Sequence, residues 1–232
     1  MITLRRADER RHIRRRKHES WLTFDRQYPA DPLSNGFGAL ERLNEDRLPP
    51  GARIPLHRYH AAEMVTYVLD GALAYNDSTG RSGVIQAGEF QRVTSGRGVR
   101  HGDTNASPID WAHVFQIGLR PSQAELDPSH DQKRFPAGAR RGGLCVIASP
   151  DGRRGSLHVH QDALIYSALV CPGQHVVHEL APGRRTWLHV VRGEATLGDV
   201  VLTTGAGAGV VADRALSLTA REETEILLVD LG

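Results

Sequence analysis

Cysteine and aromatic residues are scarce in this chain of 232 residues. Only two cysteines are present, Cys145 and Cys171, and Phe, Trp and Tyr together make 6% of the sequence. Two cysteines exclude a disulfide-dense scaffold and a zinc site of four cysteines, so we expect reduced, structural thiols. With 40% hydrophobic and 24% charged residues the chain can still bury a core, which excludes a disordered or fibrous protein.

Long hydrophobic runs are also missing. No stretch approaches the roughly 18 consecutive apolar residues that a membrane-spanning helix needs. The opening residues Met-Ile-Thr-Leu-Arg-Arg lack the apolar core of a secretion signal. We therefore expect a soluble, cytoplasmic protein with no membrane contact.

Excess charge of one sign is confined to a single segment. Residues 5–17 hold eight Lys or Arg against Asp8 and Glu9, a net charge of +6, while the whole chain carries +2 and the remainder therefore −4. Such a cluster can grip the phosphates of nucleic acid, but basic arms are more often simply solvated. No recognition helix and no basic stripe with interleaved aromatics accompanies it, so nucleic acid is not the partner we expect.

Short apolar runs bounded by turn residues indicate an all-β fold. They recur about every ten residues, whereas a helical period of 3.6 residues is hard to find. The 24 glycines and 12 prolines suit tight turns between strands. A sandwich or barrel is therefore expected. The clearest apolar runs are residues 64–69, 111–119, 164–170, 187–191 and 225–229.

The two halves of the chain repeat each other. In both, a Pro-Gly pair precedes an extended segment and a strand-like run that ends in glycine. Gly51 and Gly71 mark these points in the first half, and Gly173 and Gly193 mark them in the second, each 122 residues further on. Repetition at a fixed offset predicts two copies of one β-barrel unit. The predicted domains are residues 1–134 and 135–232, joined by a polar connector at 121–143.

Histidine and acidic residues gather in the first half. His57, Tyr59 and Glu63 follow one another closely, and His101 and Asp103 form a second group downstream. Because side chains alternate across a strand, residues 57 and 59 share one face, as do 101 and 103. Two such strands facing across a small barrel would bring imidazole and carboxylate groups to one point, where they suit Fe, Cu, Ni, Mn or Zn.

These residues and their glycines resemble the two cupin motifs. The first motif has glycine, five residues, His-x-His and a spaced glutamate, and the second has glycine, a turn, histidine and, four positions later, asparagine. The run from His57 to Gly71, the segments 88–91 and 96–103, and the ending 227–231 resemble most closely the pirin family. The resemblance implies two cupin-type barrels, also called double-stranded β-helices or jelly rolls, packed in one chain.

In pirins a metal ion is held by two histidines of the first motif and by a histidine and a glutamate of the second. Carried over residue by residue, this set falls on His57, His101 and Asp103, with Tyr59 in place of the second histidine and aspartate in place of the usual glutamate. Two histidines and one carboxylate are typical of non-haem Fe(II) sites with open positions. We expect one divalent transition metal, iron first and Cu, Ni, Mn or Zn as alternatives. Because Tyr59 replaces a ligand, an empty barrel is the competing interpretation.

The resemblance also suggests roles for Tyr59 and Glu63 in catalysis. The odd number of Glu63 predicts that it shares the face of His57, where it would orient a ligand or act as a base; a satisfied buried carboxylate is the alternative. Tyr59 would ligate a ferric ion, hydrogen-bond a substrate or fill space. His60 should face outward unless a bulge turns it in, and Asn105 should support the pocket through hydrogen bonds.

Two other motifs carry less chemistry. The pair His158 and His160 lacks a spaced glutamate, so we expect a structural role. The Gly-Ala repeat at 205–209 is followed by valines rather than a helix, which excludes a dinucleotide-binding loop. Glu179 and Arg185 stand in the second half where His57 and Glu63 stand in the first, so we expect no metal in the second domain.

Two functions follow from the resemblance to pirins. One is a metal-dependent dioxygenase similar to quercetin 2,3-dioxygenases, which uses O2 to cleave a flavonol or another small enolic or phenolic compound. The other is a non-catalytic regulatory module that senses a metal or a redox state and docks on a protein partner. The open ligand set favours the first, and the missing histidine together with the basic segment 5–17 favours the second.

Overall fold

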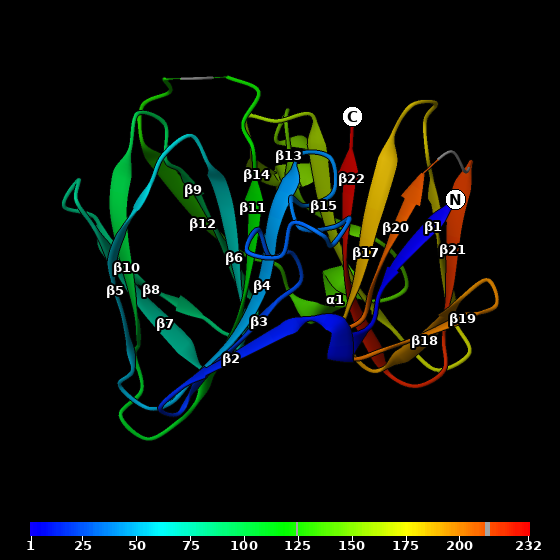
Figure 1. The fold of residues 1–232 in the computed structure, drawn as a ribbon, viewed down its shortest axis with the longest axis horizontal. Helices are drawn as coiled ribbons and strands as arrows, with labels where there is room; N and C mark the ends of the chain where they lie inside the picture. Colours follow the sequence, from blue (N-terminus) through cyan, green and yellow to red (C-terminus); the bar gives the residue numbers. More distant parts are fainter. Residues whose placement is uncertain (124, 212–213) are drawn as a thin grey trace. The chain divides into compact units, whose positions relative to one another are not determined.

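The computed structural model describes residues 1–123, 125–211 and 214–232, and its regular structure is almost entirely β-strand (Figure 1). The chain divides into two compact units. The N-unit comprises residues 11–135 and 157–161, and the C-unit comprises residues 1–10, 136–156 and 162–232. The predicted boundary after residue 134 lies beside the observed junction, but residues 1–10 and 157–161 each belong to the unit that the sequence did not predict.

Two antiparallel sheets build the N-unit. One has the strand order β12-β9-β6-β11-β4-β3-β2 and the other the order β5-β10-β7-β8. The predicted connector 121–143 is more than a linker, because β12 within it pairs along its whole length with β9. The strands of this unit are β2 (Arg11–Arg15), β3 (His18–Leu22), β4 (Leu40–Leu48), β5 (Arg53–Tyr59), β6 (Glu63–Asp70), β7 (Ala72–Asp77), β8 (Ser82–Gln86), β9 (Glu89–Thr94), β10 (Val99–Asn105), β11 (Ala112–Leu119), β12 (Ser129–Arg134) and β14 (Leu157–His158).

The C-unit repeats this arrangement. Its larger sheet runs β1-β20-β17-β22-β15-β13, and its smaller sheet runs β16-β21-β18-β19. Its strands are β1 (Ile2–Arg5), β13 (Cys145–Ser149), β15 (Ala163–Val170), β16 (His175–Glu179), β17 (Arg185–Arg192), β18 (Glu194–Leu197), β19 (Val200–Thr203), β20 (Gly207–Val211), β21 (Ala215–Ala220) and β22 (Thr224–Leu231), and its helical turns are η1 (Ala7–Glu9), α1 (Ala137–Arg140) and η2 (Arg153–Gly155).

The two units have the same strand topology. In the N-unit, β9, β6, β11, β4 and β3 follow the same order as β20, β17, β22, β15 and β13 in the C-unit. The edge position that β12 takes beside β9 is taken by β1 beside β20, with Arg5 opposite Gly207. This pairing explains why residues 1–10 belong to the C-unit. The predicted all-β fold with two copies of one unit is confirmed.

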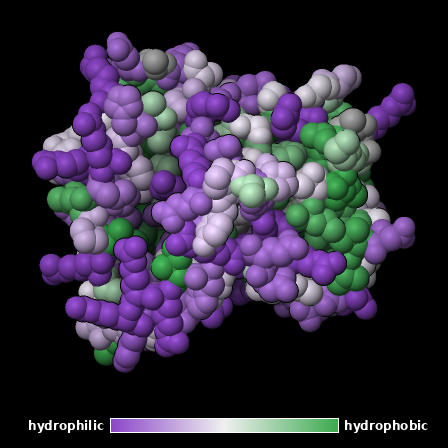
Figure 2. Space-filling model, viewed as in Figure 1, coloured by the Kyte–Doolittle hydropathy of each residue, from purple (hydrophilic) through white to green (hydrophobic). Residues whose placement is uncertain are grey.

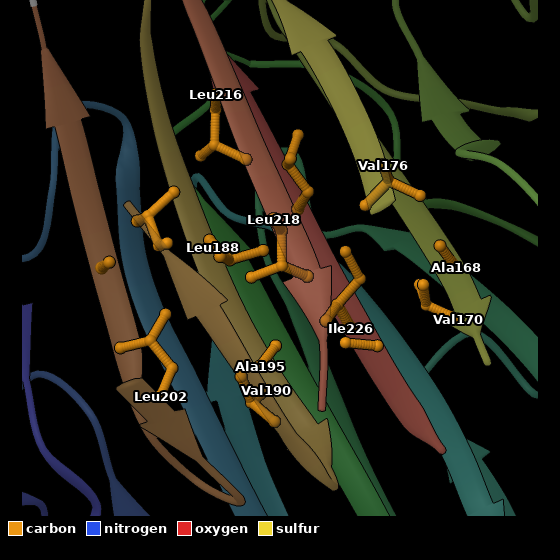
Figure 3. Close-up of a cluster of buried hydrophobic side chains, with 14 of the residues drawn as sticks. Ala168, Val170, Val176, Leu188, Val190, Ala195, Leu202, Leu216, Leu218 and Ile226 are labelled. Atoms are coloured by element: carbon orange, nitrogen blue, oxygen red, sulfur yellow. The ribbon is translucent and has the colours of Figure 1, made fainter. Parts of the chain in front are cut away.

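Each unit has its own apolar core between its two sheets. In the C-unit, strand alternation sends Val176, Leu188, Val190, Leu218 and Ile226 inward, all at most 5% exposed (Figure 3). Burying each such side chain contributes roughly 1.5–3 kcal/mol. One buried cluster of the N-unit consists of Leu48, Val68, Leu73, Tyr75, Ile85, Ala112 and Val114.

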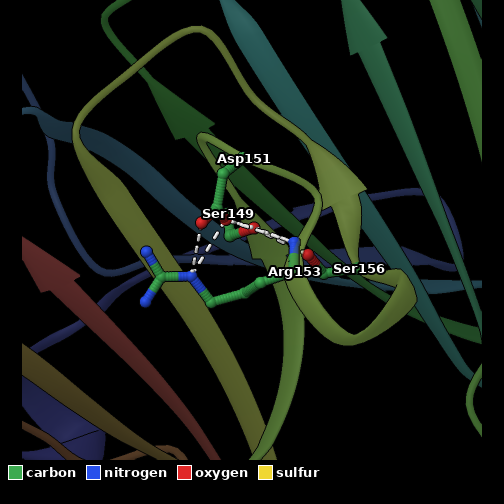
Figure 4. Close-up of polar contacts among 4 residues, drawn as sticks. All are labelled: Ser149, Asp151, Arg153 and Ser156. Carbon is green, nitrogen blue, oxygen red and sulfur yellow. Dashed lines mark hydrogen bonds and ion pairs between the residues drawn. The ribbon is translucent and has the colours of Figure 1, made fainter.

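A hydrogen-bonded turn follows β13 in the C-unit (Figure 4). The Asp151 carboxylate accepts hydrogen bonds from the Ser149 hydroxyl at 2.8 Å and from the backbone N–H and Nε of Arg153 at 3.1 and 2.9 Å. These hydrogen bonds hold the pKa of Asp151 well below its usual range. The Ser149 hydroxyl also hydrogen-bonds with the Ser156 hydroxyl at 2.7 Å, which connects the first and last residues of the turn.

The surface differs between the units on the face drawn in Figure 2. Hydrophilic side chains cover most of the N-unit, and hydrophobic side chains gather on part of the C-unit near β1 and β19. Ile2 and Val201, on these two strands, are 43% and 46% exposed. No helix in the part of the chain that the structure describes is long and apolar enough to cross a membrane.

Candidate functional site

The ladder between β5 and β10 positions the predicted metal ligands. His57 lies directly opposite His101, and Tyr59 lies opposite Val99. The register shifts before Asp103, which pairs with Ile54, so β5 carries one extra residue at Pro55–Leu56. Proline cannot donate to a ladder and is accommodated at bulges, which accounts for this irregularity. On the other side of β10 the pairing is regular, and Asp103 lies opposite Tyr75.

His101 and Asp103 form a buried pair. They are 3% and 2% exposed, and His101 Nε2 lies 2.9 Å from Asp103 Oδ1. The remaining polar atoms, His101 Nδ1 and Asp103 Oδ2, are buried and have no hydrogen-bond partner among the residues that the structure describes. A buried polar atom without a hydrogen bond destabilises the folded chain, and such atoms commonly bind a water molecule or an ion. This pair is the part of the predicted ligand set that the structure brings together.

His57 lies beside the pair but does not join it. Its ring is half-buried, and Nδ1 lies 3.1 Å from the carbonyl oxygen of Pro55. Cβ atoms of directly opposite residues on paired strands are typically about 5 Å apart, so His57 and His101 are neighbours at the level of the backbone. Among the described residues, however, no three His, Cys, Asp or Glu side chains cluster closely enough to hold a metal ion.

Tyr59 occupies the position of the absent histidine and lies between several site residues. Its ring meets that of His57 edge-on at 4.5 Å between centroids and lies 6.0 Å from that of His101. It is 6% exposed and packs with Met64. Burial raises the pKa of the Tyr59 phenol; Arg42 opposes the rise and the Asp103 carboxylate adds to it. The side chain is therefore a neutral O–H donor at physiological pH.

Sequence reasoning missed two residues of this face. Arg42 on β4 places its guanidinium carbon 5.8 Å from the centre of the Tyr59 ring. Tyr75 on β7 stacks on His101, with centroids 5.9 Å apart and planes 13° from parallel. In the sequence, the polar residues Arg42, Asn44 and Asp46 alternate along the segment that forms β4. This alternation points to the site only once β4 is known to face β5.

The prediction that Glu63 shares the face of His57 is wrong. Glu63 opens β6, where it lies opposite Thr94 and accepts hydrogen bonds from the Thr94 hydroxyl at 3.1 Å and the His160 backbone N–H at 3.3 Å. Met64, the next residue, is the one that packs with Tyr59. Ala61, at a φ of +46°, turns the chain between the two strands, so odd–even parity does not carry across.

The carboxyl group of Glu63 is instead part of a buried polar cluster. Burial raises its pKa, and the hydrogen bonds from Thr94 and His160 oppose the rise. Arg92 donates to Thr94 Oγ1 at 2.8 Å and to Ser129 Oγ at 2.6 Å, which links β9 to β12. The alternative reading of Glu63 as a buried structural carboxylate therefore fits its surroundings better than a role as base.

Two minor predictions can also be compared with the structure. Asn105 is 2% exposed and donates hydrogen bonds to the carbonyl oxygens of Leu48, Pro49 and Asp110 at 2.8–3.1 Å. These bonds hold the loops at the end of β10, in line with the supporting role predicted for Asn105. His60 is exposed, as predicted.

A pocket of about 360 Å³ opens beside Tyr59. Its wall combines apolar side chains with arginines from the loop after β3, from β4 and from β5. Its lining includes Phe24, Arg26, Glu41, Arg42, Arg58 and Met64.

Comparison with known proteins identifies the family. The family model described as Pirin matches residues 4–119, and that described as Quercetinase C-terminal cupin domain matches residues 146–231. The chain is 37% identical over 231 residues to a protein of Escherichia coli (strain K12) named quercetin 2,3-dioxygenase, covering 100% of this chain and 99% of that one. A pirin-like protein of Caulobacter vibrioides is 32% identical over 201 residues and covers 86% of each chain.

Solved structures agree with the sequence matches. The crystal structure of YhhW from Escherichia coli matches with a TM-score of 0.95 at 37% identity, covering 100% of this chain and 98% of that one. The bacterial pirin YhhW in complex with nickel(II) matches with a TM-score of 0.93 at 36% identity, covering 100% and 99%. Family models and relatives together span both units, and the chain belongs to the pirin family of two-domain cupins.

Proposed function

We propose that this chain is a metal-dependent dioxygenase that acts on a flavonol or another small enolic or phenolic compound. The observation that carries the proposal is the buried His101–Asp103 pair, with one nitrogen and one oxygen left without hydrogen-bond partners. The relative at 37% identity is named quercetin 2,3-dioxygenase, and a bacterial pirin has been crystallised with nickel(II).

The residues present fit a divalent transition metal. Imidazole nitrogens and carboxylate oxygens are ligands that iron, nickel and related metals accept, and Asp103 Oδ2 is such an oxygen with no hydrogen-bond partner in the described part of the chain. His101, Asp103 and His57 would hold the ion, since His57 faces His101 across the ladder. His57 would then exchange its contact with the Pro55 carbonyl for the metal.

The chain's own residues supply the rest of the chemistry. A bound ion polarises and orients the enolic oxygens of the substrate. Tyr59 offers a neutral phenol O–H to a substrate oxygen, and Arg42 beside it places positive charge next to the anion that forms on deprotonation. The Asp103 oxygen that does not hold the ion would accept the enolic proton, because Asp103 lies near Tyr59, whereas Glu63 hydrogen-bonds to Thr94 and His160.

Oxygen uptake after metal reconstitution tests this function. The metal-free chain is loaded anaerobically with Fe(II), Ni(II), Mn(II), Co(II) or Cu(II), and O2 consumption is followed with quercetin and simpler enols. We expect turnover with at least one metal, reduced by about 100-fold or more in His101→Ala. His158→Ala removes an exposed imidazole outside this ligand set and should keep full activity. Absence of turnover with every metal and substrate would contradict the proposal.

A second candidate is a non-catalytic module that senses a metal or a redox state. The observation that favours it is the separation of His57 from the His101–Asp103 pair, which leaves no three-ligand cluster among the described residues. Such a module would bind the metal in the same experiment but consume no oxygen, so one set of samples separates the two functions.

A further inference from the structure

We propose that the pocket beside Tyr59 recognises the carboxylate of a small aromatic acid. This acid would be a substrate of the proposed dioxygenase, and the inference rests on the proposed function only in calling the acid a substrate. Binding of such an acid needs no metal. At about 360 Å³, the pocket lies at the lower end of the roughly 300–1,000 Å³ of small-molecule sites.

The charges on the pocket wall do not cancel. Glu41 is the acidic residue of the wall, and its Oε2 lies 3.0 Å from Arg26 Nη2, while its Oε1 lies 3.8 Å from Arg120 Nε. Within the described residues, neither Arg42 nor Arg58 has a carboxylate within ion-pair distance. Two positive charges therefore remain for a ligand, and guanidinium groups bind carboxylates through paired, parallel hydrogen bonds.

The same wall provides a surface for an aromatic ring. Tyr59, Phe24 and Met64 line the pocket and are only 4–6% exposed, so their positions are held by the core. Arg42 lies close to the Tyr59 ring, partly shielded from water, and a charge–charge contact there is stronger than on an open surface. A flat ring against these apolar groups with its carboxylate toward Arg42 and Arg58 would use both features.

The pocket also adjoins the proposed metal ligands. Tyr59 contributes to its wall and contacts the ring of His57 at 4.5 Å between centroids. An acid anchored by the two arginines would therefore have its ring beside the face on which O2 chemistry is proposed. This location is what makes the carboxylate a feature of the substrate rather than of an unrelated ligand.

Calorimetry on the metal-free full-length chain tests the proposal with 4-hydroxybenzoate, its neutral analogue 4-hydroxybenzamide, and acetate. We expect the benzoate to bind about tenfold or more tightly than either of the other two, because the amide lacks the charge that the arginines recognise and acetate lacks the aromatic ring. Arg42→Gln and Arg58→Gln should each weaken benzoate binding about tenfold. Arg53→Gln, which removes an exposed charge from the far end of β5, should leave it unchanged.

Equal binding of the acid and the amide, equal binding of acetate, wild-type affinity in both arginine variants, or no binding of the benzoate would each overturn the proposal. Arg58 is exposed, so its variant is expected to fold normally, and thermal unfolding checks both variants. Because no metal is present, these results are independent of the oxygen-uptake assay. A chain that binds the acid but never consumes O2 would contradict the proposed function and still support recognition of the carboxylate in the pocket beside Tyr59.

Discussion

In the N-unit, the alternation of side chains predicts which face a residue occupies only within a single strand, not across a turn. His101 and Asp103, two positions apart on β10, meet as alternation requires. Glu63 does not follow from His57 in the same way, because the turn at Ala61 separates their strands. The geometry therefore does not support the catalytic role predicted for Glu63, and its hydrogen bonds with Thr94 and His160 support a structural role.

Replacing Glu63 distinguishes these roles. Glu63→Ala removes the acceptor for the Thr94 hydroxyl and the His160 N–H, and we expect it to lower the free energy of unfolding by about 1–3 kcal/mol. Glu63→Gln keeps an acceptor and should cost less. Urea unfolding measures the loss, and metal analysis of the same samples should show no change. Unchanged stability combined with loss of metal would instead return Glu63 to the site.

At the level of strands and turns, the sequence repeat corresponds to a structural one. Gly71 directly follows β6 and Gly193 directly follows β17, at φ of +76° and +92°. A Cβ at Gly71 would lie 2.4 Å from the Trp111 carbonyl oxygen, and one at Gly193 would lie 2.5 Å from that of Glu223. Equivalent turns in the two halves therefore require glycine for the same reason, close approach of the backbone.

Gly193→Ala should therefore be more destabilising than Gly173→Ala. Both glycines have positive φ, which costs an L-residue roughly 1–2 kcal/mol, but a Cβ at Gly173 meets no atom within 4 Å. We expect Gly173→Ala to cost no more than this and Gly193→Ala to cost at least about 1 kcal/mol further. Chemical denaturation at neutral pH measures both values. Equal losses would show that the contact with Glu223 relaxes freely.

Much of the strand pattern was predictable from sequence, because local alternation and turn residues specify it. The five apolar runs fall on β6, β11, β15, β17 and β22, and the Gly-Ala repeat at 205–209 leads into β20 rather than a helix. What the pattern could not predict is pairing between distant segments. The pairing of β1 with β20 and the contact of residues 157–161 with Glu63 depend on partners more than 90 residues away.

The ligand set was predictable only in part for a similar reason. The resemblance to pirins assigns His57, His101 and Asp103 to one centre, and two of the three meet. His57 lies on the strand with the bulge at Pro55, whose carbonyl oxygen its ring contacts. Neither the bulge nor the proximity of Arg42 to Tyr59 can be predicted without the facing strands.

At the scale of the whole chain, the two units share a topology but differ in how their buried carboxylates are satisfied. In the C-unit, Asp230 Oδ2 lies 2.9 Å from His178 Nε2, and Oδ1 accepts a hydrogen bond from Arg184 Nε at 2.7 Å. In the N-unit, Asp103 Oδ2 has no hydrogen-bond partner within residues 1–123, 125–211 and 214–232. Asp230 is therefore a satisfied carboxylate that stabilises the C-unit, whereas Asp103 keeps one oxygen available for a ligand.

This difference predicts how the C-unit responds to acid. Burial alone would raise the pKa of Asp230, but hydrogen bonds with His178 and Arg184 outweigh it and lower the pKa below the ordinary 3.8. The stability that Asp230 contributes is therefore fully present above about pH 4 and is lost as the pH falls through its pKa in the folded chain.

Asp230→Asn removes this acid dependence. We expect a loss of about 1.5–3 kcal/mol at pH 7, where the wild type has its charged hydrogen bonds, and a much smaller difference from wild type near pH 3. Urea unfolding at both pH values gives the comparison. A variant that differs from wild type by the same amount at both would show that Asp230 does not titrate in the folded chain below its ordinary value.

The proposed metal centre consists of His57 and the buried His101–Asp103 pair in the N-unit. Elemental analysis of the anaerobically reconstituted, desalted chain tests it most directly, with His101→Ala and the exposed control His158→Ala treated alongside. We expect about one first-row transition metal ion per chain in the wild type and in His158→Ala, and loss of that ion in His101→Ala. A wild type that retains no more metal than His101→Ala would contradict it.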